Sequence, residues 1–142
     1  MGRYDDTVIA RLAEIGIFAG CTKKELQEIV RLTTEVTVPK GRVLTTEGEH
    51  GSEFAIVLDG TAEVTQRGKV VNTLSPGSHY GEMALLDEGP RTATITATSE
   101  MSLAVVARNE FGQLVEDVPA VAHAVMRGLA RRIRELDSNS SL

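Results

Sequence analysis

The sequence predicts a mainly β fold, an antiparallel β roll of the jelly-roll type (a double-stranded barrel), with N-terminal helices before it and two C-terminal helices after it. Apolar residues recur at helical spacing in both end segments. Between them, residues 35–107 contain short β-branched runs with turn signals about every 8–12 residues. Eight of the thirteen glycines lie in this middle stretch. No repeat or long linker interrupts the 142 residues, so we expect one domain in all.

Residues 1–34 form the predicted N-terminal helical segment. An apolar stripe with spacings of three and four runs through Val8, Leu12, Ile15 and Phe18. Thr22 and Glu25 then fit a capping box, in which each side chain accepts a hydrogen bond from the other residue's backbone amide. Apolar residues at helical spacing follow this box over residues 26–30. Two helical stretches are therefore expected before the β roll.

The β roll itself is expected over residues 35–107. Its predicted strands lie near residues 35–38, 43–46, 54–58, 62–65, 70–74, 92–97 and 103–107. The link from Gln66 to Lys69 is short enough for a hairpin turn, and Gly68 supplies the positive φ that such turns need.

Residues 108–136 are predicted to form two C-terminal helices. Asn109 is a good N-cap residue for the first helix, and Pro119 suits the start of the second. The second helix has an apolar stripe at Val121, Val125, Met126, Leu129, Ile133 and Leu136. Residues 137–142 have almost no apolar content, so a disordered tail is expected there.

The charge and composition exclude several classes of protein. The formal net charge of −5 argues against electrostatic binding of a nucleic-acid backbone by the chain as a whole. A single cysteine, Cys21, forms no internal disulfide and no zinc ribbon. No apolar run approaches the ~18 residues of a membrane span, and the first residues lack a signal-peptide core. We therefore expect a cytoplasmic protein without a membrane segment.

One polar, glycine-flanked segment at residues 77–93 interrupts the strand pattern. Glu82 begins a run of helix formers, and the first amides of a helical turn lack intrahelical partners and attract anions. Arg91 follows nine residues later and offers a planar fork of two donors for a phosphate. A carboxylate beside an anion site needs another ligand group to accept from, and a sugar hydroxyl is such a group. Glu82 and Arg91 together therefore suggest a sugar phosphate.

The run Gly81-Glu82-Met83-Ala84-Leu85-Leu86, followed by Pro90-Arg91-Thr92-Ala93, resembles the phosphate-binding cassette of cyclic nucleotide-binding domains, the family of cAMP receptor proteins and protein kinase A regulatory subunits. The resemblance extends over roughly residues 8–136. It implies that Glu82 binds the ribose 2′-hydroxyl and Arg91 the cyclic phosphate. It also implies that Gly81, Met83 and Ala84 contribute backbone groups, and that Thr92 and Ala93 close the pocket.

Further roles implied by the resemblance concern the base and a C-terminal lid. Val64 and Val71 would face the base, and Leu129, Arg132 and Leu136 would fold over the bound nucleotide. The expected function is a regulatory sensor for a cyclic nucleotide that signals by rearranging its C-terminal helix. The expected ligand is cAMP, although Thr92 does not separate cAMP from cGMP.

Structural explanations compete with each of these roles. Taken singly, Arg91 is a candidate for a surface ion pair with Asp87 or Glu88, and Glu82 for a solvated residue of a helical turn. Val64 and Val71 are equally explained as core residues. The arginines near the end of the last helix complement the helix dipole. At the level of the whole chain, the alternatives are an interaction module that has lost its ligand and a sensor of another phosphorylated small molecule.

No enzyme activity, metal site or resident cofactor is predicted. His50, His79 and His123 are widely spaced, without the His-x-His pair that would supply two metal ligands from one strand. The serines show no nucleophile-elbow pattern. Only six residues follow Leu136, too few for a DNA-recognition helix, so no DNA-binding domain is expected in this chain. The output would then pass through an unknown protein partner or self-association, or the chain is a regulatory piece of a larger protein.

Overall fold

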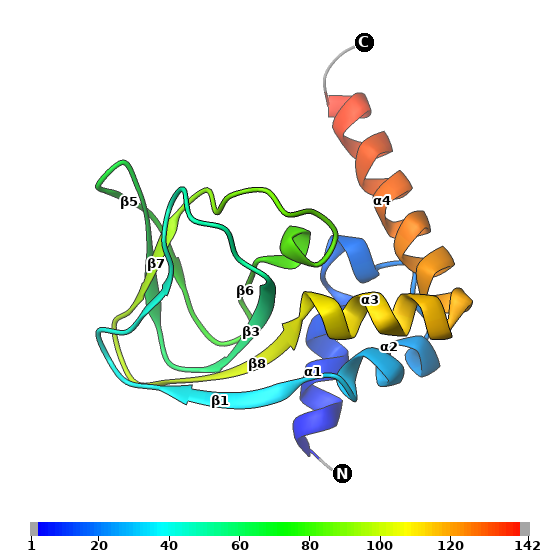
Figure 1. Cartoon of the computed structure of the whole chain (residues 1–142), viewed down its shortest axis with the longest axis horizontal. Coiled ribbons are helices and arrows are strands. Elements are labelled where there is room, and N and C mark those ends of the chain that lie inside the picture. The colour runs from blue at the N-terminus through cyan, green and yellow to red at the C-terminus, as the bar shows by residue number, and fades with distance from the viewer. Residues whose placement is uncertain (1–2, 140–142) are drawn as a thin grey trace. The chain divides into compact units, whose positions relative to one another are not determined.

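The computed structural model describes residues 3–139 of the chain (Figure 1). The described chain divides into two compact units. The β unit is Thr33–Glu110, and the helical unit combines the chain up to Leu32 with the chain from Phe111 onward. The β unit corresponds to the predicted roll, and the helical unit joins the two predicted helical ends. That the two units fold as a single domain stays a prediction.

The first of the two sheets in the β unit has the strand order β1-β8-β3-β6, and all its pairs are antiparallel. These strands are β1 (Thr34–Val38), β3 (Glu53–Asp59), β6 (His79–Tyr80) and β8 (Met101–Ala107). β3 and β8 are the central strands, and their apolar residues are largely buried. The two-residue strand β6 pairs with β3 through Ala55 and Ile56 and lies directly before the cassette.

The second sheet has the order β2-β7-β4-β5, again antiparallel. Its strands are β2 (Val43–Thr45), β4 (Ala62–Gln66), β5 (Lys69–Leu74) and β7 (Thr94–Ala97). Apolar residues from both sheets form one buried cluster: Val38, Val57, Ala62, Leu74, Ile95, Ala97, Met101 and Leu103. Two antiparallel sheets that share one buried core, with helices at both ends of the chain, confirm the predicted fold class.

The hairpin between β4 and β5 turns at Arg67 and Gly68, which have φ of 52° and 79°. Two consecutive positive φ values are typical of a type I′ turn, which matches the twist of the strands on either side. The predicted role of Gly68 is therefore confirmed. Arg67 adopts a left-handed conformation that is uncommon for a residue with a side chain, and its amide donates to Glu47 Oε1 at 3.0 Å.

Two details of the strands differ from the prediction. β6 was not predicted, because two residues carry too little pattern to be recognised as a strand. The strand expected from residue 92 begins at Thr94. The backbone of Arg91 bonds instead to Gly48 and Glu49, and the carbonyl of Thr92 accepts from the Gln66 side chain at 3.0 Å. These residues use their polar groups outside the sheet.

The helical unit begins with α1 (Arg3–Ala13), the short 3₁₀ helix η1 (Gly16–Phe18) and α2 (Lys23–Val30). The capping box is confirmed, since Thr22 Oγ1 accepts from the Glu25 amide and Glu25 Oε1 accepts from the Thr22 amide. The stripe from Val8 to Phe18 was expected to be continuous, but it is divided between α1 and η1. Its apolar residues are nevertheless all buried.

The last two helices are α3 (Arg108–Asp117) and α4 (Pro119–Asn139). Pro119 is the first residue of α4, as expected. Asn109 does not cap α3, because α3 begins one residue earlier and follows β8 without a break; its side chain accepts from the next amide at 3.0 Å. α4 continues to Asn139, so residues 137–139 of the predicted tail are helical, and residues 140–142 lie outside the described residues.

Glycines allow α4 to approach the N-terminal segment closely inside the helical unit. A Cβ atom at Gly128 would come within 2.7 Å of the Ile17 carbonyl oxygen, and one at Gly20 within 2.8 Å of the Ala124 carbonyl oxygen. The rings of Phe18 and Phe111 meet edge to face, with centroids 6.1 Å apart. Gly128 therefore provides space for packing in addition to its low helix propensity. None of the described helices has the length and apolar character needed to cross a membrane.

Candidate functional site: a cavity in the β unit

The β unit contains a cavity of about 490 Å³. Residues of β4, β5 and β6 line it, together with the segment that follows β6. All seven residues predicted for the cassette are among the lining residues: Gly81, Glu82, Met83, Ala84, Arg91, Thr92 and Ala93. The fold therefore brings together two parts of the cassette that lie ten residues apart in the chain.

A 3₁₀ turn, η2 (Glu82–Leu85), forms the first part of the cassette. Gly81 precedes it with φ of 80°, a left-handed conformation that glycine adopts without strain. Ala84 and Leu85 are buried and anchor the turn, while Met83 is 51% exposed. The Ala84 amide donates to the Gly81 carbonyl at 2.8 Å, so this amide is already used inside the turn. The turn predicted from the helix formers at residues 82–86 is present.

Glu82 is half-buried at the start of η2, and its Oε2 lies 3.0 Å from Nδ1 of His79 on β6. The side chains of His79 and Glu82 are 34% and 26% exposed. A carboxylate restrained in this way is a well-defined acceptor, since its rotamers are limited before any ligand arrives. His79 was considered only as a possible metal ligand in the sequence, and its contact with Glu82 was missed.

Arg91 lies in the second part of the cassette. Its backbone is held by the β2–β3 loop and its side chain by the first residue of β3. Its amide donates to the Glu49 carbonyl at 2.8 Å, and its carbonyl accepts from the Gly48 amide at 2.9 Å. Nη2 of its guanidinium donates to the Glu53 carbonyl at 2.8 Å. The neighbouring acid Glu88, one of the two suggested ion-pair partners, pairs instead with Arg108 at 3.1 Å.

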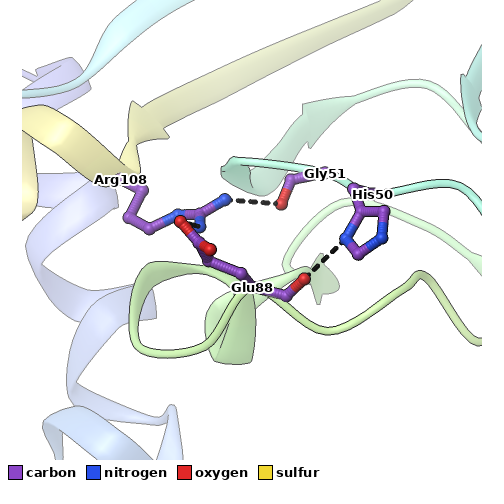
Figure 2. Close-up of polar contacts among 4 residues, drawn as sticks. All are labelled: His50, Gly51, Glu88 and Arg108. Atoms are coloured by element: carbon purple, nitrogen blue, oxygen red, sulfur yellow. Dashed lines mark hydrogen bonds and ion pairs between the residues drawn. The ribbon is translucent and has the colours of Figure 1, made fainter.

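Figure 2 shows how the end of the cassette is joined to the β2–β3 loop and to the start of α3. Arg108 donates to the Gly51 carbonyl at 3.1 Å and pairs with the Glu88 carboxylate. Nδ1 of His50 lies 2.6 Å from the Glu88 carbonyl, and because a carbonyl only accepts, Nδ1 carries the proton. The Glu88 side chain is 86% exposed, so its ion pair adds little stability, and the bonds to backbone carbonyls matter more.

The two residues expected to face the base lie differently with respect to the cavity. Val64 on β4 lines the cavity, whereas Val71 on β5 does not and is 53% exposed. Asn72 and Leu74 line the cavity in its place, because alternate residues of a strand share one face. The register shows the same arrangement, since Val64 pairs directly with Asn72. Val71 was assigned to the base side by the resemblance, and its contact with a base stays a prediction.

Tyr80 also lines the cavity and was missed in the sequence. Burial raises the pKa of its phenol to about 12, with a smaller contribution from the negative charge of Glu53. The phenol therefore remains protonated at physiological pH and is available as a hydrogen-bond donor. Thr45 on β2 is the other missed polar residue, and its buried hydroxyl donates to the Ala93 carbonyl at 2.9 Å.

The predicted lid residues lie on α4 in the helical unit. Leu129 is half-buried, whereas Arg132 and Leu136 are exposed. Arg132 also lies near Gly16, where a Cβ atom would come within 3.2 Å of its Nη1 atom. Contact between these residues and a bound nucleotide stays a prediction.

Other chemistry has little support in the described part of the chain. Residues 3–139 contain no group of three or more His, Cys, Asp or Glu side chains that could hold a metal ion. The pKa of the Cys21 thiol is raised to about 11, mainly by burial and further by the charge of Glu25. Such a thiol is protonated at neutral pH and is a poor nucleophile.

Comparisons with known proteins agree with this geometry. The family described as "Cyclic nucleotide-binding domain" matches residues 35–118. A CRP-like cAMP-activated global transcriptional regulator of Mycobacterium tuberculosis is 27% identical over 133 residues, which are 90% of this chain and 59% of the relative. The chain thus spans less than two thirds of that relative's length.

Two solved structures are similar over most of the chain. The N-terminal domain of a transcriptional regulator from Streptomyces coelicolor has a TM-score of 0.82 at 29% identity, covering 90% of this chain and 95% of that one. The regulatory domain of Toxoplasma gondii PKA, crystallised with cAMP, has a TM-score of 0.71 at 28% identity, covering 80% and 45%. The family match extends over more than half of the sequence, and the chain belongs to the cyclic nucleotide-binding domain family of regulatory domains.

Proposed function

We propose that this chain is a non-enzymatic sensor of cAMP. The observation that carries the proposal is the convergence of Glu82 and Arg91 on one cavity, with the other five cassette residues around them. A half-buried carboxylate suits a ribose hydroxyl, and a guanidinium held by the Glu53 carbonyl suits a cyclic phosphate. The similarity to a cAMP-activated regulator and to a domain crystallised with cAMP supports this ligand.

The choice of cAMP over cGMP rests on these relatives more than on the cavity. Val64, Leu74 and Ile95 give the base side an apolar wall, and Asn72 adds one amide that can either donate or accept. Thr92 lines the cavity with an exposed side chain, so its hydroxyl is accessible to either base. We therefore treat cGMP as the competing ligand for the same site.

Calorimetric titration with cAMP, cGMP and AMP tests the proposal. We expect cAMP to bind most tightly and AMP to bind least, because AMP lacks the cyclic phosphate ester that the cassette encloses. Tighter binding of cGMP would leave the assignment of the site unchanged but would make cGMP the preferred ligand. Binding of none of the three would favour the alternative of an interaction module on the same fold, for which a damaged cassette would be the expected signature.

We further propose that cAMP acts on the C-terminal part of α4. Leu129, Arg132 and Leu136 would contact the bound nucleotide, and a ligand that contacts only one position of a helix shifts the equilibrium toward that position. Hydrogen exchange is the test. We expect saturating cAMP to protect the amides of residues 125–136, and truncation after Gly128 to weaken binding. Unchanged exchange in this segment would leave a nucleotide-binding domain without this switch.

The proposed output is contact with a protein partner or with a second copy, in the cytoplasm. Met126, Ile133 and Leu136 on α4 are 55%, 59% and 60% exposed. Exposed apolar residues that recur along one helix are typical of surfaces that are covered on association. Sedimentation velocity with and without cAMP would test self-association, and a monomer under both conditions would favour a different protein as the partner.

A further inference from the structure

The loop between β2 and β3 fixes the backbone of Arg91. This loop, residues 46–52, exchanges two backbone hydrogen bonds with Arg91 through Gly48 and Glu49, at 2.9 and 2.8 Å. An isolated antiparallel bridge joins His50 to Pro90 beside them. The position of the Arg91 Cα atom is thus set by a segment some forty residues earlier in the chain.

The same segment also sets the direction of the guanidinium. Nη2 donates to the carbonyl of Glu53, the first residue of β3. Gly51 lies directly against the guanidinium, and a Cβ atom placed on Gly51 would overlap Nε and Cζ of Arg91. Gly81 also lies close to it, because a Cβ atom there would come within 2.5 Å of Nη1. The guanidinium therefore occupies space that a side chain at either glycine would fill.

The two glycines differ in why they are required. Gly81 has φ of 80°, so a side chain there would strain the backbone whatever the space around it. Gly51 is not among the residues with positive φ, so its backbone is open to any residue. The space taken by the Arg91 side chain is then the structural reason for glycine at position 51.

We propose that Gly51 is a positioning residue for Arg91, so that the affinity for the anionic part of the ligand depends on a residue outside the cassette. The proposal rests on the proposed function, because it assigns Arg91 to the cyclic phosphate. A Cβ at position 51 displaces the far end of a flexible side chain, which can move aside without unfolding the domain. The guanidinium then loses its bond to Glu53 and its place beside the cavity.

The test begins with Gly51→Ala and cAMP binding measured by calorimetry. Because a misplacement on the order of 1 Å in a positioning group can cost roughly a hundredfold, we expect binding to weaken by about 10- to 100-fold. Adenosine, which lacks the phosphate, should bind the variant and the wild type equally. The matched control is Gly112→Ala on α3, where a Cβ atom meets nothing within 4 Å and cAMP affinity should be unchanged.

A double-mutant cycle with Arg91→Ala separates this proposal from the proposed function, because it needs no ligand. With Arg91 present, Gly51→Ala should lower Tm by roughly 2–4 °C through the lost Glu53 bond. With Arg91→Ala, Gly51→Ala should leave Tm unchanged, since the group it displaces is gone. Additive effects, or a cAMP affinity that Gly51→Ala leaves intact, would overturn the proposal. Wild-type protein that binds no cyclic nucleotide, together with a non-additive cycle, would overturn the proposed function alone.

Discussion

The cassette in the β unit and the last part of α4 in the helical unit are built in opposite ways. In the cassette, Glu82 contacts His79, and Arg91 is bonded through its amide, carbonyl and guanidinium. In α4, every side chain from residue 131 to 138 is exposed. Restrained groups bind with little loss of conformational freedom, whereas a segment with few contacts moves at low cost. Under the proposed function, recognition would belong to the β unit and response to the helical unit.

Removal of the Arg91 side chain should have the largest effect on the restrained region. Arg91→Ala should cost ~2–5 kcal/mol of cAMP binding, because the cyclic phosphate would lose a desolvated charge partner. This corresponds to a loss of roughly 30-fold to a few thousand-fold in affinity by calorimetry. Arg91→Lys should also weaken binding, since a point charge does not replace a planar fork. The control is Arg42→Ala, an exposed arginine outside the cavity. If Arg91→Ala binds cAMP with wild-type affinity, the cassette is not the binding site.

Glu82→Gln should have the next largest effect. A hydrogen bond between a ribose hydroxyl and an ionised carboxylate is worth ~1.5–3 kcal/mol, and the amide retains only part of it. Calorimetry should show a larger loss for cAMP than for 2′-deoxy-cAMP, which has already lost the donor. Equal losses for both ligands would mean that Glu82 serves only to restrain His79 and the turn.

Tyr80 should make the stability of the β unit vary with pH in the alkaline range. Its pKa is raised from 10.0 to about 12, so between these values the folded chain keeps a proton that the unfolded chain loses. The contribution of Tyr80 to stability should therefore be constant below pH 10 and fall above it, by at most about 2–3 kcal/mol. Urea unfolding of the wild type and of Tyr80→Phe between pH 8 and 11 would show the effect as a difference. Parallel curves for the two proteins would contradict it.

The smallest expected effect is the change in the free energy of unfolding when a side chain in the exposed part of α4 is truncated. Leu136→Ala should change the free energy of unfolding by less than about 0.5 kcal/mol, because the side chain is 60% exposed. The same variant should weaken cAMP binding if Leu136 covers the nucleotide. The matched control is Met126→Ala, because Met126 lies earlier on α4 and its side chain is similarly exposed. A large loss of stability without loss of affinity would place Leu136 in the packing of the free protein.

Local patterns in the sequence were sufficient for most of the fold. The capping box at Thr22, the turn at Gly68 and the start of α4 at Pro119 each depend on neighbouring residues, and each is present. Features that depend on distant contacts were missed. β6 exists through its pairing with β3. At the start of the strand expected from residue 92, the carbonyls of Thr92 and Ala93 accept from the side chains of Gln66 and Thr45.

The candidate site shows the same division. The cassette residues were predicted because they share a contiguous motif, and all of them line one cavity. Val71 was assigned to the base side by the resemblance, whereas in the structure its neighbour Asn72 is the residue that lines the cavity. The restraints on Glu82 and Arg91 come from His79 and from the β2–β3 loop. A single sequence offers no signal for such partners, since neither their spacing nor their residue types are unusual.

The direct junction between Ala107 and Arg108 restricts how this chain tolerates insertions. No residue separates β8 from α3, and α3 starts in the β unit and ends in the helical unit. One residue inserted after Ala107 would rotate the rest of α3 by roughly 100° about its axis and lengthen it by about 1.5 Å. Arg108 would then either lose its contacts with Gly51 and Glu88 or no longer be the first residue of the helix. Length variation should therefore be selected against at this junction and tolerated in the exposed β4–β5 turn, where a reporter domain could be inserted.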